Sequence, residues 1–328
     1  MLNVLLNTKD DVIVIDPEAE YRGMAQMLHG EVIRIAKGSD VYINPMDMNM
    51  SYAGDNDDPL SLKVDFMISL CEAIAQGELT PVQMSLIDKC VKKSYREYIH
   101  SYNPVTKKVD DNLIPTLLDF KRILEQERGP DARYLADCLT LYTEGTLDTF
   151  AHPTNVDYNN RFVVYNIRDM GTNLKSLGLL IVLDNIWNRI LENQKKGRFT
   201  WIYIDEIYLL FKTRYSATFF MELWKRSRKY GGVCTGITQN VQDIINNEIA
   251  NTMIANSEFI QMLSQGYQDK LILAEFLDIS ETNLGYISNS TPGEGLLYVG
   301  NSSIVPFVNR FPTDTSMYQA LSSKMKEI

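Results

Sequence analysis

The stretch Trp201-Ile-Tyr-Ile-Asp205-Glu206 decides the fold expected for this chain. Four apolar residues in a row are typical of a strand that is buried on both faces, as in a parallel sheet covered by helices. The two consecutive acids follow the strand directly, at the carboxyl edge where open α/β sheets bind their ligands. The sequence therefore predicts an α/β fold with a carboxylate site at that edge.

Strand and helix signals alternate on both sides of this stretch. Val12 to Asp16 is a short β-branched run that ends in an acid and Pro17, and it is typical of a buried strand. Further strands are predicted at 31–36, 161–167, 199–204, 233–237 and 258–263, and helices at 18–28, 173–194, 216–229 and 240–255. Two short helices within 267–287 and a terminal hairpin of 295–300 with 303–308, turning at Asn301-Ser302, complete the chain.

Between the second and third strands the alternation stops and four helix signals follow one another. Helices are expected over 59–76, with Asp58 as N-cap, over 80–99, with a capping box in Thr80-Pro-Val-Gln83, and from Pro115 and Pro130 onward. We therefore expect a mainly parallel sheet formed by residues 1–56 and 156–328, interrupted by an all-helical insertion at 57–155.

Composition excludes several classes of protein. The 328 residues are 45% hydrophobic and 23% charged, which excludes a disordered or collagen-like chain. The four cysteines lack the spacing of a zinc site or a disulfide framework, and neither a signal peptide nor a membrane-spanning apolar run is present. A net charge of −10 argues against a nucleic-acid-binding surface over the whole protein, although residues 195–230 hold nine bases against three acids.

Asp205 and Glu206 match the Walker B pattern of nucleoside triphosphatases. In such enzymes the first acid holds the magnesium shell and the second orients or deprotonates the attacking water. The alternative is that a strand-end acid only caps the next turn. Asp16 and Glu20 could lie at the same edge of the sheet, or could simply form a turn and a helix N-terminus, which favours acids.

Two further groups are candidates for nucleotide chemistry. Gln239 follows the strand after Walker B, where a polar amide could sense the γ-phosphate or its water, while Thr238 or Asn240 could instead be a helix N-cap. Arg228 and Lys229 end the preceding helix. Bases there complement the helix dipole, but a guanidinium is also suited to the phosphate of a neighbouring subunit's nucleotide.

With these motifs in order, the chain resembles the traffic ATPases of bacterial type IV secretion, in the conjugal-transfer branch, which are related more distantly to hexameric DNA translocases. The resemblance covers nearly all of the chain, and no single motif carries it. The matching segments are Val14-Ile-Asp-Pro-Glu-Ala-Glu20-Tyr, Ile43-Asn-Pro45, Gly145 to Asn155, Asp205-Glu206, Arg228-Lys229-Tyr-Gly and Thr238-Gln239. The resemblance implies a RecA-like P-loop NTPase core with an inserted all-helical subdomain.

The resemblance also implies a function, namely hydrolysis of ATP with Mg²⁺ to power substrate transfer or pilus assembly. It implies a cytoplasmic location at the bacterial inner membrane, other secretion components as partners, and a homohexamer with weak or indirect DNA binding. The implied roles are magnesium binding through water by Asp205, action on the attacking water by Glu206, sensing by Gln239, action in trans by Arg228 or Lys229, and cofactor binding by Asp16 and Glu20. The alternatives are a non-catalytic docking module and a DNA translocase.

One expected element is missing from the printed sequence. A phosphate-binding loop needs G-x-x-x-x-G-K-[ST], and no Gly-Lys pair occurs in residues 1–328. In the family this loop would precede the helix that leads into the Val12 strand, so Met1 to Asn7 resembles the end of that helix. The expectation is a fragment cut after its Walker A motif and inactive by itself. The rival is a natural chain that never hydrolyses ATP.

Overall fold

A computed structural model gives the structure of this chain, and it describes residues 1–48, 58–103, 105–106, 109–239, 241–288, 290–300 and 303–321. The chain forms two compact units. Unit 1 contains residues 1–205 and 222–235, and unit 2 contains residues 206–221 and 236–328. Each unit is described by itself below.

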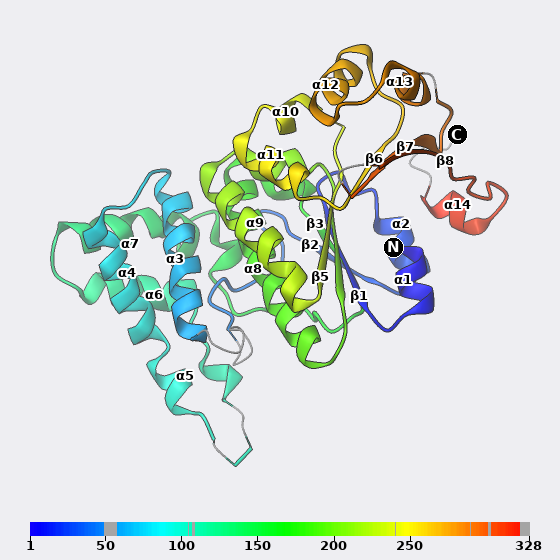
Figure 1. Cartoon of the computed structure of the whole chain (residues 1–328). Helices are drawn as coiled ribbons and strands as arrows, with labels where there is room; N and C mark the ends of the chain where they lie inside the picture. Colours follow the sequence, from blue (N-terminus) through cyan, green and yellow to red (C-terminus); the bar gives the residue numbers. More distant parts are fainter. Residues whose placement is uncertain are drawn as a thin grey trace. The chain divides into compact units, whose positions relative to one another are not determined.

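Unit 1 is built on a five-stranded sheet with the order β2-β3-β1-β4-β5 (Figure 1). The strands are β1 (Asp11–Asp16), β2 (Glu31–Arg34), β3 (Phe162–Asn166), β4 (Thr200–Ile204) and β5 (Gly232–Gly236). β1 pairs in parallel with β3 and with β4, and β2 pairs in parallel with β3. This agrees with the strands expected from the sequence to within three residues at each end and confirms the α/β class.

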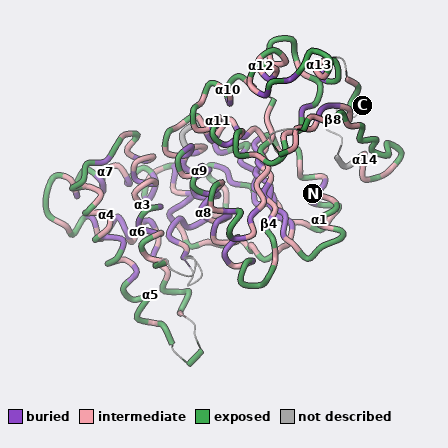
Figure 2. Tube along the Cα trace, viewed as in Figure 1, coloured by how far each residue is buried: buried purple, intermediate pink, exposed green. Residues whose placement is uncertain are grey.

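Every residue of β1 is buried, because the sheet has an apolar layer on each face. Val12 and Val14 face a cluster that also holds Val4 of α1 (Leu2–Asn7) and Met24 of α2 (Arg22–Met27). The long helix α8 (Gly171–Lys195) also contacts β4 in the same unit. Figure 2 shows that buried residues concentrate along the strands and α8. The continuous apolar runs that predicted these strands reflect the fact that the sheet is covered by apolar residues on both faces.

The helix expected over 18–28 is shorter than predicted. α2 begins only at Arg22, because residues 17–19 form a turn in which Ala19 adopts a left-handed backbone conformation with φ of 64°. Pro17 follows the last residue of β1, and two backbone N–H groups of the turn are bonded to Asp16, as described below. The local signal for helix is therefore overridden by a turn that a strand-end carboxylate organises.

The region between β2 and β3 contains helices joined by loops, as expected. These helices are α3 (Pro59–Ala75), α4 (Pro81–Ser94), α5 (Arg96–His100), α6 (Leu117–Gln126) and α7 (Pro130–Thr143). The Asp58 N-cap and the Thr80–Gln83 capping box are both formed. The helix predicted over 80–99 is divided by one residue, Tyr95, into α4 and α5, but backbone hydrogen bonds from the Tyr95 N–H to the Val91 carbonyl and from the Ile99 N–H to the Tyr95 carbonyl continue across it. The Tyr95 side chain is fully buried and donates its hydroxyl to the Met46 carbonyl.

The helices are tied to the rest of unit 1 through the Ile43-Asn-Pro45 segment. Lys63 of α3 is fully buried, and its Nζ donates to Asp184 of α8 at 2.8 Å and to the Pro45 carbonyl at 3.0 Å. The Asn44 backbone N–H donates to Thr154 Oγ1 at 2.8 Å. The chain entering the helical region is thus bonded to the chain leaving it. The boundaries at residues 57 and 155 stay a prediction.

Unit 2 combines short helices with a second, antiparallel sheet. Its strands β6 (Phe259–Met262), β7 (Glu294–Val299) and β8 (Ser303–Val308) pair in that order. The predicted hairpin is confirmed, and its turn residues Asn301 and Ser302 lie outside the described residues. Its helices are α10 (Val241–Ile245), α11 (Glu248–Ala255), α12 (Tyr267–Leu277), α13 (Glu281–Ser288) and α14 (Ser316–Leu321), the last of which the sequence did not predict.

The single helix predicted over 240–255 is wrong, because α10 and α11 are separate helices. The side chain of Asn247 accepts hydrogen bonds from the backbone N–H groups of Ile249 and Ala250, which starts α11 as a new helix. One apolar cluster packs α12 and α13 against the sheet through Met262, Leu273, Ile287 and Leu296.

Candidate functional site at the carboxyl edge of the sheet

Three neighbouring strands of unit 1 end in polar residues at the same edge. β1 lies between β3 and β4, and Asp16 is paired with Asn166. Asp205 directly follows β4, and its backbone N–H donates to the Ile15 carbonyl at 3.1 Å. Because parallel strands end at one edge of a sheet, this register brings Asp16, Asn166 and Asp205 together. The sequence predicted the two acids there and missed Asn166, although a polar residue ending an apolar strand was the available signal.

Asp16 is held by its own turn. It is 1% exposed, and its two carboxylate oxygens accept the backbone N–H groups of Glu20 and Tyr21, each at 3.1 Å. These bonds directly support the turn interpretation of Asp16. A role of Asp16 in cofactor binding stays a prediction.

Tyr21 is a residue of this edge that sequence reasoning passed over. The pKa of its hydroxyl is raised far above the usual value, first by burial and then by the negative charges of Asp205, Asp16 and Glu20. The charges of all three acids predicted for the site therefore act on the Tyr21 hydroxyl, which is consistent with their lying in one region. Glu20 itself is exposed to solvent.

Glu206 begins the connection that leaves the sheet. It has a left-handed backbone conformation, with φ of 47° and ψ of 50°, which is unusual for a residue with a side chain. Such conformations are costly and concentrate at functional positions. Asp205 and Glu206 are both partly exposed as residues, unlike the enclosed Asp16, although one carboxylate oxygen of Glu206, Oε2, is buried.

Within unit 2, the segment after Glu206 is bonded to the segment that contains Gln239. The Ile207 N–H donates to the Ile237 carbonyl at 2.9 Å. A Cβ atom on Gly236 would lie 2.3 Å from Ile207 Cδ1, so glycine permits this close approach. Glu206 immediately precedes Ile207, and Gln239 lies two residues after Ile237, so this hydrogen bond links the two segments that carry Glu206 and Gln239. Gln239 is exposed, and Asn240, which could cap the next helix, lies outside the described residues.

Arg228 and Lys229 lie at the other end of the sheet. The helix α9 (Arg214–Ser227) ends before them, and they form a short 3₁₀ turn just before β5. The Thr200 N–H donates to the Gly231 carbonyl at 2.9 Å, so this turn adjoins the amino end of β4. Asp205 follows the carboxyl end of the same five-residue strand, roughly 17 Å away at ~3.3 Å per residue.

Two consequences follow from this position. Lys225 and Arg226 lie in the last turn of α9, where positive charges stabilise the negative end of the helix dipole. Arg228 and Lys229 lie beyond that turn, so the helix dipole explains their presence less well. Both of these later side chains are exposed, and they lie on the opposite edge from Asp205 of their own chain. Their predicted role in trans stays a prediction.

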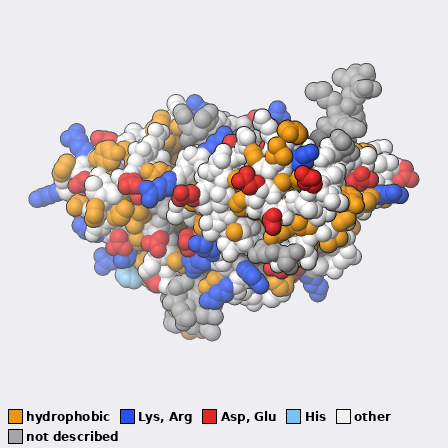
Figure 3. Space-filling view, turned by 45° about the horizontal axis from the view of Figure 1, so that its top comes forward, with side chains coloured by type: hydrophobic (Ala, Val, Ile, Leu, Met, Phe, Trp, Pro, Cys, Tyr) orange, Lys and Arg blue, Asp and Glu red, His pale blue; other side chains and the backbone are white. Residues whose placement is uncertain are grey.

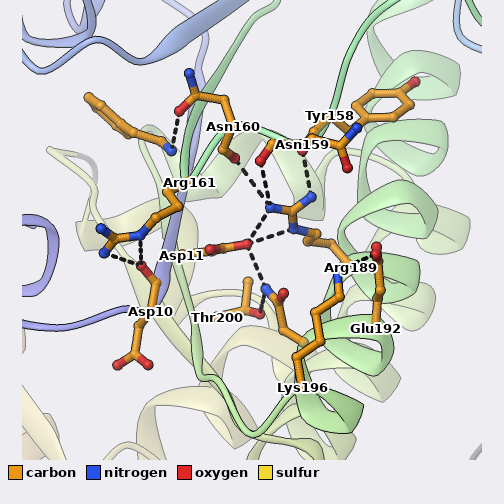
Figure 4. Close-up of polar contacts among 12 residues, drawn as sticks. Asp10, Asp11, Tyr158, Asn159, Asn160, Arg161, Arg189, Glu192, Lys196 and Thr200 are labelled. Carbon is orange, nitrogen blue, oxygen red and sulfur yellow. Dashed lines mark hydrogen bonds and ion pairs between the residues drawn. The ribbon is translucent and has the colours of Figure 1, made fainter.

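The amino edge of the sheet holds a buried ion pair that the sequence did not reveal (Figure 4). Asp11 is 1% exposed, and its Oδ2 accepts Arg189 Nε at 2.7 Å and Asn193 Nδ2 at 2.8 Å. The Arg189 guanidinium also donates to the Tyr158 carbonyl at 2.6 Å and to the Asn160 carbonyl at 3.3 Å. This arrangement fixes the chain as it returns from the helical region into β3.

Charge on the surface is mixed rather than of one sign. On the face shown in Figure 3, Lys and Arg side chains are interspersed with Asp and Glu side chains and with apolar ones. In the described parts of the chain, no helix has the length and apolar character needed to cross a bilayer. Those parts also contain no group of three His, Cys, Asp or Glu residues arranged to bind a metal.

The carboxyl edge suits Mg²⁺ as nucleotide enzymes hold it. Mg²⁺ keeps several waters and commonly takes one or two carboxylates together with substrate phosphates. Asp205 offers a partly exposed carboxylate at this edge, with the charges of Asp16 and Glu20 nearby. These residues therefore fit a water-mediated magnesium site and do not form a complete protein cage.

The parallel sheet, the acids at its carboxyl edge and the helical region between its strands define the class of α/β nucleoside triphosphatase cores. A family model described as the TraG P-loop domain matches residues 1–289. The chain therefore belongs to the TraG P-loop domain family. Membership places it among the ATPase motor domains of conjugation and type IV secretion. No curated protein sequence matches the chain.

One solved structure shows the same fold, and a second is more distantly similar. VirB4 of Thermoanaerobacter pseudethanolicus is similar with a TM-score of 0.77 and 24% sequence identity, over 93% of this chain and 83% of that one. The plasmid coupling protein TrwB, solved in complex with ADP and Mg²⁺, is similar with a TM-score of 0.48 and 13% identity, over 93% of this chain and 86% of that one.

Proposed function

We propose that this chain supplies the catalytic carboxylates for hydrolysis of ATP in the presence of Mg²⁺, in a motor that serves conjugation or type IV secretion. The observation that carries the proposal is the pair Asp205-Glu206, which follows a parallel strand of alternating buried and partly exposed residues at the carboxyl edge of the sheet. The strained backbone of Glu206 and the bonded Ile207–Ile237 pair, which leads to Gln239, support it.

The roles follow from chemistry. Asp205 would hold Mg²⁺ through bound water, and the ion would neutralise charge on the phosphates. Glu206 would accept the proton of a water that attacks the γ-phosphorus, as the bond from that phosphorus to the β–γ bridging oxygen breaks to give ADP and phosphate. Gln239 would orient the same water. Asp16 shapes the turn, and Glu20 remains a weaker candidate for binding the cofactor.

Arg228 or Lys229 would act on the nucleotide of a neighbouring copy, because they lie on the opposite edge from the acids of their own chain. Catalysis would then need an oligomer, for which a hexamer is expected. The partners would be other secretion components at the inner membrane, with direct DNA binding weak at most.

The role of Glu206 is tested in the complete gene product, in which ATP turnover and ATP affinity are measured together. Glu206→Gln should retain nucleotide and lower turnover by about 10²–10⁴-fold, because a general base is lost while the side-chain volume is kept. Glu222→Gln, which changes an exposed glutamate of α9, is the matched control and should turn over normally. Normal turnover by Glu206→Gln would remove it from the mechanism. A complete product that neither binds nor hydrolyses ATP would favour a docking module.

The role in trans is tested by mixing variants. Arg228→Ala should fold and bind ATP but lose ~10³-fold or more in turnover, the scale of an arginine finger. Mixing it with an excess of Glu206→Gln should return some activity, because each variant supplies what the other lacks. If Arg228→Ala and Lys229→Ala both turn over normally, the 3₁₀ turn is only a solvated surface.

A further inference from the structure

Gly236 is the last residue of β5, and its backbone conformation does not call for a glycine. Its φ lies outside the left-handed region that favours glycine, so a side chain here would not strain the backbone. The residue is also exposed to solvent. A glycine in a strand that neither a turn nor burial explains often marks the close approach of another segment.

The segment that approaches Gly236 is Ile207. A Cβ atom on Gly236 would lie 2.3 Å from Ile207 Cδ1 and 3.4 Å from both Cγ1 and Cγ2 of the same side chain. The first distance is roughly 1 Å shorter than ordinary contact between carbon atoms. Ile207 is only 5% exposed, so neighbours enclose its side chain and the Cδ1 methyl group has little room to turn away. A side chain at position 236 would therefore push Ile207 away from β5.

The backbone of Ile207 is held at the same place as its side chain. Its N–H donates to the carbonyl of Ile237 at 2.9 Å, and Ile237 directly follows Gly236. The apolar contact and the hydrogen bond thus fix one residue against the end of β5, once through the side chain and once through the main chain. Moving the side chain away would also disturb this hydrogen bond.

The chain after Ile207 is anchored separately. Ile207 begins the 3₁₀ helix Ile207–Phe211, in which Leu210 is fully buried. The Leu210 carbonyl accepts the hydroxyl of Ser216, a residue that is 1% exposed, at 2.6 Å. Glu206 lies on the other side of Ile207 and is partly exposed. A displacement of Ile207 would therefore be passed to Glu206 more readily than to the 3₁₀ helix.

We propose that Gly236 is a positioning residue for ATP hydrolysis, because the absence of its side chain seats Ile207 against β5 and thereby orients the Glu206 carboxylate. Glu206 has φ of 47° and ψ of 50°, in the small left-handed region that is allowed for a residue with a side chain. A shift of the next peptide takes Glu206 out of this region and redirects its side chain. The inference rests on the proposed function, in which Glu206 acts on the attacking water.

Gly236→Ala in the complete gene product tests the proposal. Turnover of ATP should fall by about 10–100-fold, because a misplacement of ~1 Å in a catalytic group lowers the rate on this scale. ATP affinity should be retained, as it should be in Glu206→Gln. The matched control is Gly285→Ala in α13, where a Cβ atom would meet nothing within 4 Å, and this variant should turn over normally.

A compensating substitution distinguishes this contact from a general loss of stability. Ile207→Val removes Cδ1, the atom that would lie 2.3 Å from the new Cβ atom, and keeps Cγ1 and Cγ2, which would lie at 3.4 Å. The double variant Gly236→Ala/Ile207→Val should therefore recover most of the turnover of Ile207→Val alone. Urea denaturation of each variant shows whether its folding is intact.

A second combination tests whether Gly236 acts through Glu206. In Glu206→Gln the general base is already lost, so adding Gly236→Ala should cause little further loss of the residual turnover. A residue that merely stabilised the fold would lower turnover by the same factor in both backgrounds.

The outcomes separate this inference from the proposed function. Normal turnover by Glu206→Gln would overturn the proposed function and the inference with it. Slow turnover by Glu206→Gln together with normal turnover by Gly236→Ala would overturn the inference alone. The same conclusion would follow if Gly236→Ala/Ile207→Val were as slow as Gly236→Ala, or if Gly236→Ala lowered turnover equally with and without Glu206→Gln.

Discussion

The two ends of strand β1 carry the same residue type in two different environments. Asp11 at the amino end and Asp16 at the carboxyl end are each 1% exposed. Asp11 is enclosed with a buried cation, Arg189, whereas Asp16 accepts two backbone N–H groups of its own turn. Asp205, which follows the neighbouring strand, is partly exposed to solvent.

This difference shows that the role of an acid at a strand end depends on its hydrogen-bond and ion-pair partners and not on its position in the strand. A carboxylate paired with a buried guanidinium stabilises the fold and is unavailable to a ligand. A carboxylate that accepts backbone N–H groups shapes a turn. An acid that keeps some exposure to solvent, as Asp205 does, can still reach a hydrated ion. The following predictions test how the partners of each acid set its effect on stability, and they run from the largest expected effect to the smallest.

The largest effect is expected from breaking the buried pair at the amino end. Arg189→Met should lower the free energy of unfolding by about 3–5 kcal/mol, because it leaves Asp11 charged, buried and without its cation. Urea denaturation measures the change. The matched control is Arg34→Met, which breaks an exposed pair with Asp169 whose side chains are 62% and 43% exposed. It should cost under about 1 kcal/mol, and equal losses would show that burial of the pair does not matter.

A smaller effect is expected at the carboxyl end of the same strand. Asp16→Ala should cost about 1–3 kcal/mol, because the N–H groups of Glu20 and Tyr21 lose their acceptors. Asp16→Asn keeps one acceptor oxygen and should lose about half as much. Glu18→Gln on the exposed surface of the same turn should change stability by less than ~0.5 kcal/mol. If Asp16→Ala is as stable as the unmodified chain by urea denaturation, the turn does not depend on this carboxylate.

The smallest effect concerns Tyr21 and appears only in alkali. Burial and the neighbouring acids raise the pKa of its hydroxyl, so the folded chain retains a proton that the unfolded chain loses above pH ~10. Stability should therefore fall as pH rises through that range, and Tyr21→Phe should make the fall shallower by up to about 1 kcal/mol.

Urea midpoints at pH about 8 and about 11 measure the effect, which spans the usual tyrosine pKa. Tyr203→Phe is the comparison, since burial alone raises the pKa of Tyr203. Tyr21→Phe should relieve more of the alkaline loss than Tyr203→Phe does. Identical slopes would show that the acids of the carboxyl edge do not act on Tyr21.

Much of the fold could be predicted because its signals are local. The buried strands follow from apolar runs, and the starts of α3 and α4 follow from Asp58 and the Thr80–Gln83 capping box. The errors occur where a side chain accepts backbone N–H groups. Asn247 starts α11 as a new helix within the helix predicted over 240–255, and Asp16 replaces the first turn of another predicted helix by accepting backbone N–H groups.

The candidate site was predicted only in part. Asp205, Asp16 and Glu20 were expected at one edge because parallel strands end together, and the charges around Tyr21 agree with this. Tyr21 and Asn166 were not foreseen, since neither is a catalytic acid or base by type. The chemical roles of Asp205, Glu206 and Gln239 stay predictions, as do those of Arg228 and Lys229.

The sequence by itself determined the class of this protein, because hydrophobic period, helix caps and an acid pair after an apolar strand depend on neighbours along the chain. The tertiary structure alone decided which acids are enclosed and which remain accessible. Asp11 and Arg189 are 178 residues apart, and the buried pair Lys63–Asp184 joins residues that are 121 apart. The reason is physical: burial, ion pairing and surface charge depend on distances in space, and these are set only when the sheet places remote segments side by side.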